Sequence, residues 1–92
     1  MTTNTTNADI LIIDDETGIL DTLSDILGDE GYTTYTAANA AEARTQNLQH
    51  KPQLILLDIW MPDTDGISLL REWQNSGALQ CPVVIMSGHG TI

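Results

Sequence analysis

The stretch LILLDIWMPDTDG, from Leu54 to Gly66, constrains the fold of this chain more than any other feature. Four apolar residues end at a single carboxylate, Asp58, and residues typical of turns follow it. A short apolar run bounded by such signals predicts a fully buried strand. A carboxylate at the end of a buried strand needs partners or a cation, because an isolated buried charge is costly. We therefore expect Asp58 to be a functional residue.

Three further apolar runs alternate with segments of helical periodicity. The sequence predicts strands over residues 10–13, 32–36, 54–58 and 83–86, and helices over residues 17–30, 40–51 and 67–76. Strands that alternate with helices are typical of an α/β fold with a parallel sheet, helices on both faces and right-handed crossovers. The apolar stripe of the first helix is predicted to include Ile26, and the thin stripe of the second to consist of Ala43 and Leu48.

Length and charge exclude several classes of protein. The chain has 92 residues, enough for one small domain. Thirteen acidic residues against three basic ones give a net charge of −10. This balance argues against nucleic acid, which needs clustered Lys and Arg, and against an anionic membrane surface. It suits a divalent cation or a partner with a basic patch.

The start of the chain and its single cysteine suggest the compartment of the protein. Residues 1–8 are mainly polar and are expected to form a disordered tail before a domain over residues 9–92. They lack the basic start and apolar segment of a secretory signal. One cysteine, Cys81, excludes an internal disulfide and fits a reducing compartment, so we expect a cytoplasmic protein.

Polar residues follow three of the predicted strands. Asp14 and Asp15 follow the first strand, Asp58 ends the third and Ser87 follows the fourth. Because ligands bind at the carboxyl ends of parallel strands, these side chains are expected to lie together. Crowded carboxylates repel one another and call for a cation. A ligand set made only of oxygen favours a hard ion such as Mg²⁺.

The motifs together resemble a known family. Asp14-Asp15, DIWMPDTDG at residues 58–66 and VIMSGHG at residues 84–90 resemble the receiver domain of two-component response regulators, most closely the nitrogen-regulatory NtrC/NtrX type. The resemblance implies a CheY-like, flavodoxin-like doubly wound sheet, here with four strands in the order 2-1-3-4. It also implies that Gly66 shapes the turn beside Asp58.

The resemblance implies a role for each site residue. Asp58 would accept a phosphoryl group from a sensor histidine kinase. Asp15 and Asp58 would bind Mg²⁺ through their side chains, Trp60 through its backbone carbonyl and Asp14 through a water. Ser87 would be the switch hydroxyl that hydrogen-bonds the phosphoryl group. Receivers of this type regulate sigma54-type transcriptional activators, which implies transcription regulation as the output.

The chain departs from the family pattern after its fourth strand. The last strand with its lysine, and the helices beside it, are absent, and the only lysine, Lys51, is expected at the end of the second helix, away from the site. Loss of a fifth strand would bare the edge of the fourth, which is apolar and carries no charge. We therefore expect a homodimer, or an oligomer with swapped elements, through this edge.

Two other functions remain open. The chain could be a dimerisation module that is never phosphorylated, because the family's lysine is missing. It could also be a Mg²⁺-dependent aspartyl phosphatase or phosphotransferase. Enzymes of the haloacid dehalogenase type place a second aspartate two residues after the nucleophile, and Trp60 at that position counts against this alternative.

Overall fold

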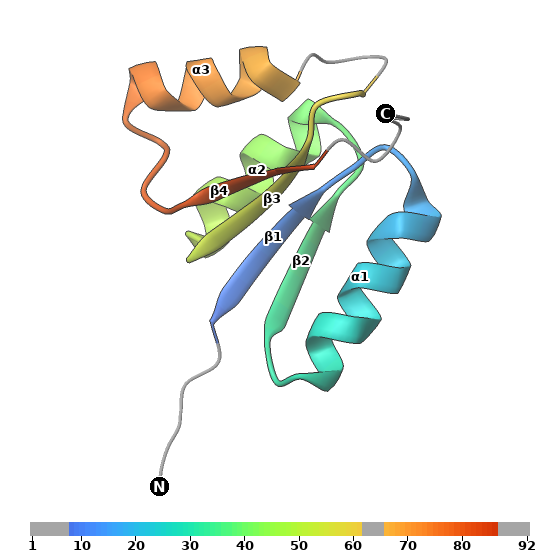
Figure 1. The fold of residues 1–92 in the computed structure, drawn as a ribbon. Helices are drawn as coiled ribbons and strands as arrows, with labels where there is room; N and C mark the ends of the chain where they lie inside the picture. Colours follow the sequence, from blue (N-terminus) through green and yellow to red (C-terminus); the bar gives the residue numbers. More distant parts are fainter. Residues whose placement is uncertain (1–7, 62–65, 87–92) are drawn as a thin grey trace, which may run out of the picture.

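The computed structural model describes residues 8–61 and 66–86 of the chain. They form a parallel sheet in the order β2-β1-β3-β4 with helices on both faces (Figure 1). The elements in chain order are β1 (Asp9–Ile13), α1 (Thr17–Asp29), β2 (Thr33–Ala37), α2 (Ala40–His50), β3 (Leu54–Asp58), α3 (Gly66–Ser76) and β4 (Val83–Met86). The strand order confirms the predicted one.

Each face of the sheet has its own apolar cluster, because alternate residues of a strand point to opposite faces. The larger cluster joins Leu11, Ile13, Ile55 and Leu57 of the central strands to residues of α2 and α3, including the almost fully buried Trp73. The smaller cluster joins Ile10 and Ile12 to Leu20 of α1. The two central strands are therefore buried on both faces, as their unbroken apolar runs predicted.

Local capping sets the ends of α1 and α2. At the end of α1, Gly31 has a φ of +97° and its N–H donates to Gly28, while Tyr32 donates to Leu27, which is the Schellman arrangement. At the start of α2, the Glu42 N–H donates to Asn39 Oδ1 over 2.9 Å. The Glu42 side chain accepts from the Ala38 N–H over 2.8 Å, one residue earlier than in a standard capping box, where the N-cap N–H is the donor.

Two predicted core positions are wrong. Leu48 is 77% exposed, and the buried side of α2 consists of Ala40, Ala43 and Asn47. Ile26 of α1 is 53% exposed, and Leu20 is the buried residue of that helix. Periodicity alone cannot choose between adjacent residues of a helix, and in α2 a buried amide with a partner replaced the expected leucine.

The predicted disordered tail lies outside the described residues except for Ala8. The Ala8 carbonyl accepts a hydrogen bond from the Thr33 N–H over 3.1 Å, so the pairing of β1 with β2 begins there. Among the residues that the structure describes, no helix has the length and apolar character needed to cross a membrane.

Candidate functional site

Strand register brings three carboxylates together at the carboxyl end of the sheet. β1 and β3 pair in parallel with Ile13 opposite Leu57, so Asp14 and Asp58 follow at the same level. One carboxylate oxygen from each of Asp14, Asp15 and Asp58 lies within 4.8 Å of the other two. The predicted convergence of these three residues is therefore confirmed.

Backbone N–H groups orient two of these carboxylates. The Glu16 N–H donates to Asp14 Oδ1 over 2.9 Å, and the Trp60 N–H donates to Asp58 Oδ1 over 3.0 Å. In both hydrogen bonds the donor lies two residues after the aspartate, which is the arrangement of an Asx turn. The chain thus turns immediately after β1 and β3 while each carboxylate stays fixed at the strand end. Sequence reasoning did not predict the contribution of the Glu16 backbone.

Burial and like charge disfavour ionisation of Asp14. Asp14 is 2% exposed and Asp58 is 0% exposed. Burial raises the pKa of Asp14 above its ordinary value, and the charges of Asp58 and Asp15 and a hydrogen bond with Asp58 raise it further. The Glu16 N–H opposes this shift in the pKa of Asp14. A cation bound among the three carboxylates would relieve the same repulsion.

Gly66, the first residue of α3, lies directly against the end of β3. A Cβ atom at this position would lie 2.7 Å from the Asp58 carbonyl oxygen and 2.8 Å from the Ile59 Cα. Both neighbours are backbone atoms, which cannot turn aside as a side chain could. Glycine therefore allows α3 to start in contact with the strand that carries Asp58, which gives a physical reason for the predicted importance of Gly66.

The structure describes some of the remaining predicted site residues and leaves others outside the described ranges. Trp60 is 57% exposed and lies two residues after Asp58, while Met61 is buried. Ser87 lies outside the described residues, as do Pro62 and the three residues after it. Lys51 follows α2 with a φ of +47° at the opposite end of the sheet, as predicted from the helix boundary.

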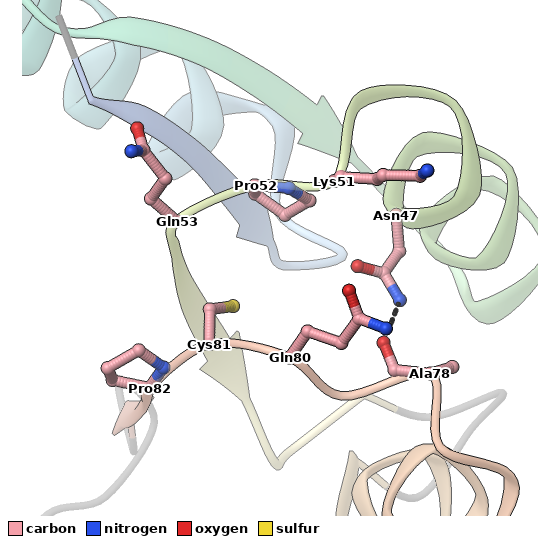
Figure 2. Close-up of a pocket in the computed structure, with 8 residues that line it drawn as sticks. All are labelled: Asn47, Lys51, Pro52, Gln53, Ala78, Gln80, Cys81 and Pro82. Atoms are coloured by element: carbon pink, nitrogen blue, oxygen red, sulfur yellow. Dashed lines mark hydrogen bonds between the residues drawn. The ribbon is translucent and has the colours of Figure 1, made fainter.

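A second polar region lies at this opposite, amino end of β3 and β4. A cavity of about 270 Å³ is bordered there by the end of α2, by the residues before β3 and by the residues before β4 (Figure 2). Asn47, 9% exposed, donates from Nδ2 to the Ala78 carbonyl over 3.1 Å. The residues that line the cavity are Asn47, Lys51, Pro52, Gln53, Ala78, Gln80, Cys81 and Pro82. Sequence reasoning missed this cavity. The signal that could have indicated it was Asn47, a polar residue at a position of α2 where the helical spacing places core residues.

Comparison with known proteins identifies the family of this fold and site. The response regulator receiver domain family matches residues 10–92. The chain belongs to this family. The match covers both acidic motifs, and the family is one of regulatory domains in two-component systems, with no enzyme family indicated.

Relatives of this receiver domain support the resemblance to the NtrX type. The nitrogen assimilation regulatory protein NtrX of Azorhizobium caulinodans is 43% identical over 86 residues, which are 91% of this chain and 19% of that protein. The sporulation initiation phosphotransferase F of Bacillus subtilis is 36% identical, covering 94% of this chain and 68% of that protein. The crystal structure of NtrX from Brucella abortus has a TM-score of 0.82 at 42% identity, covering 92% of this chain and 19% of that one.

These matches settle the fold class and the extent of the similarity. A CheY-like receiver from Methanospirillum hungatei matches with a TM-score of 0.75, which confirms the flavodoxin-like α/β fold. The chain spans about a fifth of the length of the NtrX relatives, 19% in both cases above.

Proposed function

We propose that this receiver domain accepts a phosphoryl group on Asp58. The observation that supports this most is the position of Asp58, which is fully buried at the end of a central strand with two further carboxylates within 4.8 Å. In the transfer, a carboxylate oxygen of Asp58 forms a bond to phosphorus while the bond from phosphorus to an imidazole nitrogen of a phosphohistidine breaks. The electron pair returns to the imidazole, which takes up a proton.

The donor set around Asp58 fits Mg²⁺. All three side chains offer oxygen, and each carries a charge that disfavours the charge of its neighbours. Asp15 and Asp58 would hold the ion through their carboxylates and Trp60 through its backbone carbonyl, and Asp14 would act through a water. When bound, Mg²⁺ neutralises charge on the phosphoryl group as it is transferred. The chain's own contribution is to hold these oxygens in place through the N–H groups of Glu16 and Trp60.

The other parts of the proposal rest on the family and on the NtrX relatives. The phosphoryl donor is a sensor histidine kinase in the cytoplasm, and Ser87 hydrogen-bonds a phosphoryl oxygen after transfer. The regulated output is a sigma54-type transcriptional activator, since the relatives include the nitrogen assimilation regulatory protein NtrX. The net charge of −10 favours a donor protein with a basic docking surface.

Incubation with Mg²⁺ and acetyl phosphate followed by intact mass measurement tests the phosphoryl acceptance. We expect one added phosphoryl group on the wild type, lost on mild alkaline treatment as an acyl phosphate is. Asp58→Asn should remove the adduct. Asp21→Asn, on the exposed side of α1, changes the net charge equally and should keep it. Absence of an adduct on the wild type, or its persistence in Asp58→Asn, would contradict the proposal.

A second candidate function is self-association through β4, without need for phosphorylation. The observation that favours it is the exposure of two apolar residues of this strand, 48% for Val84 and 42% for Ile85. An exposed apolar edge strand is a template for pairing with another chain. Sedimentation velocity over a range of concentrations tests it, and a monomer throughout would contradict it.

A further inference from the structure

A further cavity, of about 420 Å³, lies between the end of β2 and the first two turns of α2. β2 is an outer strand of the sheet, with β1 and β3 between it and β4 (Figure 1). The walls come from residues 36–46, a stretch that the structure describes completely. The residues that line this β2–α2 cavity are Thr36, Ala41, Glu42, Thr45 and Gln46. It therefore lies at the same end of the sheet as the acidic site without sharing a residue with it.

The polar side chains that line the β2–α2 cavity offer mainly hydrogen-bond acceptors. The Thr45 hydroxyl donates its hydrogen to the Ala41 carbonyl over 3.2 Å, so its oxygen is left as an acceptor. Glu42 Oε1 accepts from the Ala38 N–H, and the second oxygen of this carboxylate has lone pairs of its own. None of the described residues that line the cavity is Lys or Arg. Such a lining suits a ligand that donates hydrogen bonds and carries positive charge.

Gln46 is the lining residue whose polar group the fold does not satisfy. Its side-chain oxygen, Oε1, is buried and has no hydrogen-bond partner among the residues that the structure describes. An unpaired buried acceptor destabilises a fold, so a group of this kind calls for an explanation. Because the oxygen has no hydrogen bond to break, the amide can turn toward the cavity at little cost. A donor bound in the cavity would then give the oxygen its partner.

The chemistry of the lining favours an arginine side chain over other cations. A guanidinium has five N–H donors in one plane, no acceptor and a permanent charge. It is more weakly hydrated than the ammonium of lysine, so it loses less when it enters a partly enclosed cavity. The Glu42 carboxylate and the net charge of −10 attract such a group. Arginine is also one of the residues that most often anchor protein interfaces.

We infer that the β2–α2 cavity receives an arginine side chain of a partner protein. The guanidinium donates to Gln46 Oε1 and to the second oxygen of Glu42. The arginine is one anchor of a wider contact, and the partner lies at the carboxyl end of the sheet. The inference goes beyond the function proposed above and does not rest on phosphoryl acceptance at Asp58.

Short peptides test the inference by NMR titration of the labelled chain. The probes are a blocked Ala–Arg–Ala tripeptide and the same peptide with citrulline, which keeps the shape of arginine and lacks its charge. We expect the arginine peptide to shift the side-chain amide signal of Gln46. The citrulline peptide should bind at least about tenfold more weakly, as the loss of hydrogen bonds to a charged group predicts. Equal affinities of the two peptides would overturn the inference.

Gln46→Met removes the acceptor at nearly constant side-chain length. We expect this variant to bind the arginine peptide at least about tenfold more weakly. It should also unfold at a higher urea concentration than the wild type, because no unpaired oxygen is buried. Gln49→Met, at an exposed position of α2, should change neither property. A more stable Gln46→Met that binds the peptide as the wild type does would show a purely structural position and overturn the inference.

Two further variants separate this site from the proposed phosphoryl acceptor. Glu42→Gln keeps an acceptor for the Ala38 N–H and removes the charge, so it should also weaken peptide binding. Asp58→Asn should bind the peptide as the wild type does, and Gln46→Met should still take a phosphoryl group from acetyl phosphate. The two proposals can therefore fail independently. Guanidinium chloride that binds as tightly as the arginine peptide would indicate a site for a small molecule and overturn the assignment to a protein partner.

Discussion

The two ends of the sheet place polar groups in opposite ways. At the carboxyl end, Asp14 and Asp58 are almost completely buried beside Asp15, and their charges oppose one another. At the amino end, the buried amide of Asn47 donates to a backbone carbonyl, and no carboxylate lines the cavity. The buried amide of Asn47 at the amino end is neutral and paired, whereas the carboxylates at the carboxyl end carry like charges at close range.

The crowded carboxylates at the carboxyl end lower the stability of the fold, whereas the paired amide at the amino end raises it. Buried like charges destabilise a fold unless a cation or a proton neutralises them. A buried amide with a partner stabilises the contact between the elements that it joins. We therefore expect changes at the carboxyl end to alter ligand binding first, and changes at the amino end to alter only the free energy of unfolding.

The largest expected effect is on Mg²⁺ binding. Asp15→Asn should weaken Mg²⁺ by about tenfold or more, because it removes a proposed charged ligand. Titration of the fluorescence of Trp60, which is exposed beside the site, measures the affinity; the other tryptophan, Trp73, is 3% exposed. Asn47→Ala should leave the affinity unchanged. Equal affinities in wild type and Asp15→Asn would remove Asp15 from the site.

Gly66→Ala should destabilise the protein by about 1–3 kcal/mol, the usual cost of overpacking. The added Cβ would lie 2.7 Å from the Asp58 carbonyl oxygen, so α3 or β3 must shift. Urea unfolding measures the loss. Gly28→Ala in α1 is the matched control, because a Cβ there meets nothing within 4 Å. Alanine at this helical position should stabilise by about 0.5–1 kcal/mol, and a loss as large as that at Gly66 would refute the steric explanation.

Asn47→Ala should cost about 1–3 kcal/mol, because it leaves the Ala78 carbonyl without its donor. The free energy of unfolding by urea is the measurement. Asn75→Ala, at an exposed position of α3, should change it little. An unaltered stability in Asn47→Ala would mean that the amide adds nothing to the contact between α2 and the segment after α3.

Asp14→Asn should stabilise the metal-free protein by about 0.5–2 kcal/mol, since it removes a buried like charge. Because the folded state raises the pKa of Asp14, it binds this proton more tightly than the unfolded state, and stability falls as the pH rises through the raised pKa. The gain from the substitution should be full above the raised pKa of Asp14 and shrink as the pH falls toward 3.8, the ordinary pKa.

Urea unfolding in EDTA at several pH values measures this gain. Asp21→Asn, with the same change in net charge on an exposed part of α1, corrects for the general effect of acidity. A gain that persists unchanged at low pH would show that the charge of Asp14 is not its cause.

The smallest effect belongs to an exposed ion pair near the amino end. Arg44 and Glu72 join α2 to α3 through bonds of 2.8 and 2.9 Å, and the ion pair lowers the pKa of Glu72. Both side chains are about half exposed, 50% and 44%, so solvent screens the pair. Glu72→Gln should change the thermal midpoint very little, and a large loss would show that this contact is stronger than its exposure suggests.

The sequence predicted the carboxyl end of the sheet better than the amino end. Short apolar runs define buried strands, and parallel strands end at one edge, so the meeting of Asp14, Asp15 and Asp58 followed from the order of the elements. The amino-end cavity depends on where three chain segments pack together. Asn47 stands at a core spacing from Ala40 and Ala43, but its amide gains a partner only in the fold, at the carbonyl of Ala78, which lies 31 residues away.

The contact between Gly66 and β3 has a mechanical consequence. The first residue of α3 rests on the Asp58 carbonyl and on Ile59 without room for even one more carbon atom. A displacement of the backbone at Asp58 therefore cannot be absorbed between the strand and the helix. We expect α3 to move with the end of β3 as one rigid body, so that a shift at Asp58, the proposed acceptor, would be transmitted along the 11-residue helix to Ser76, at its other end.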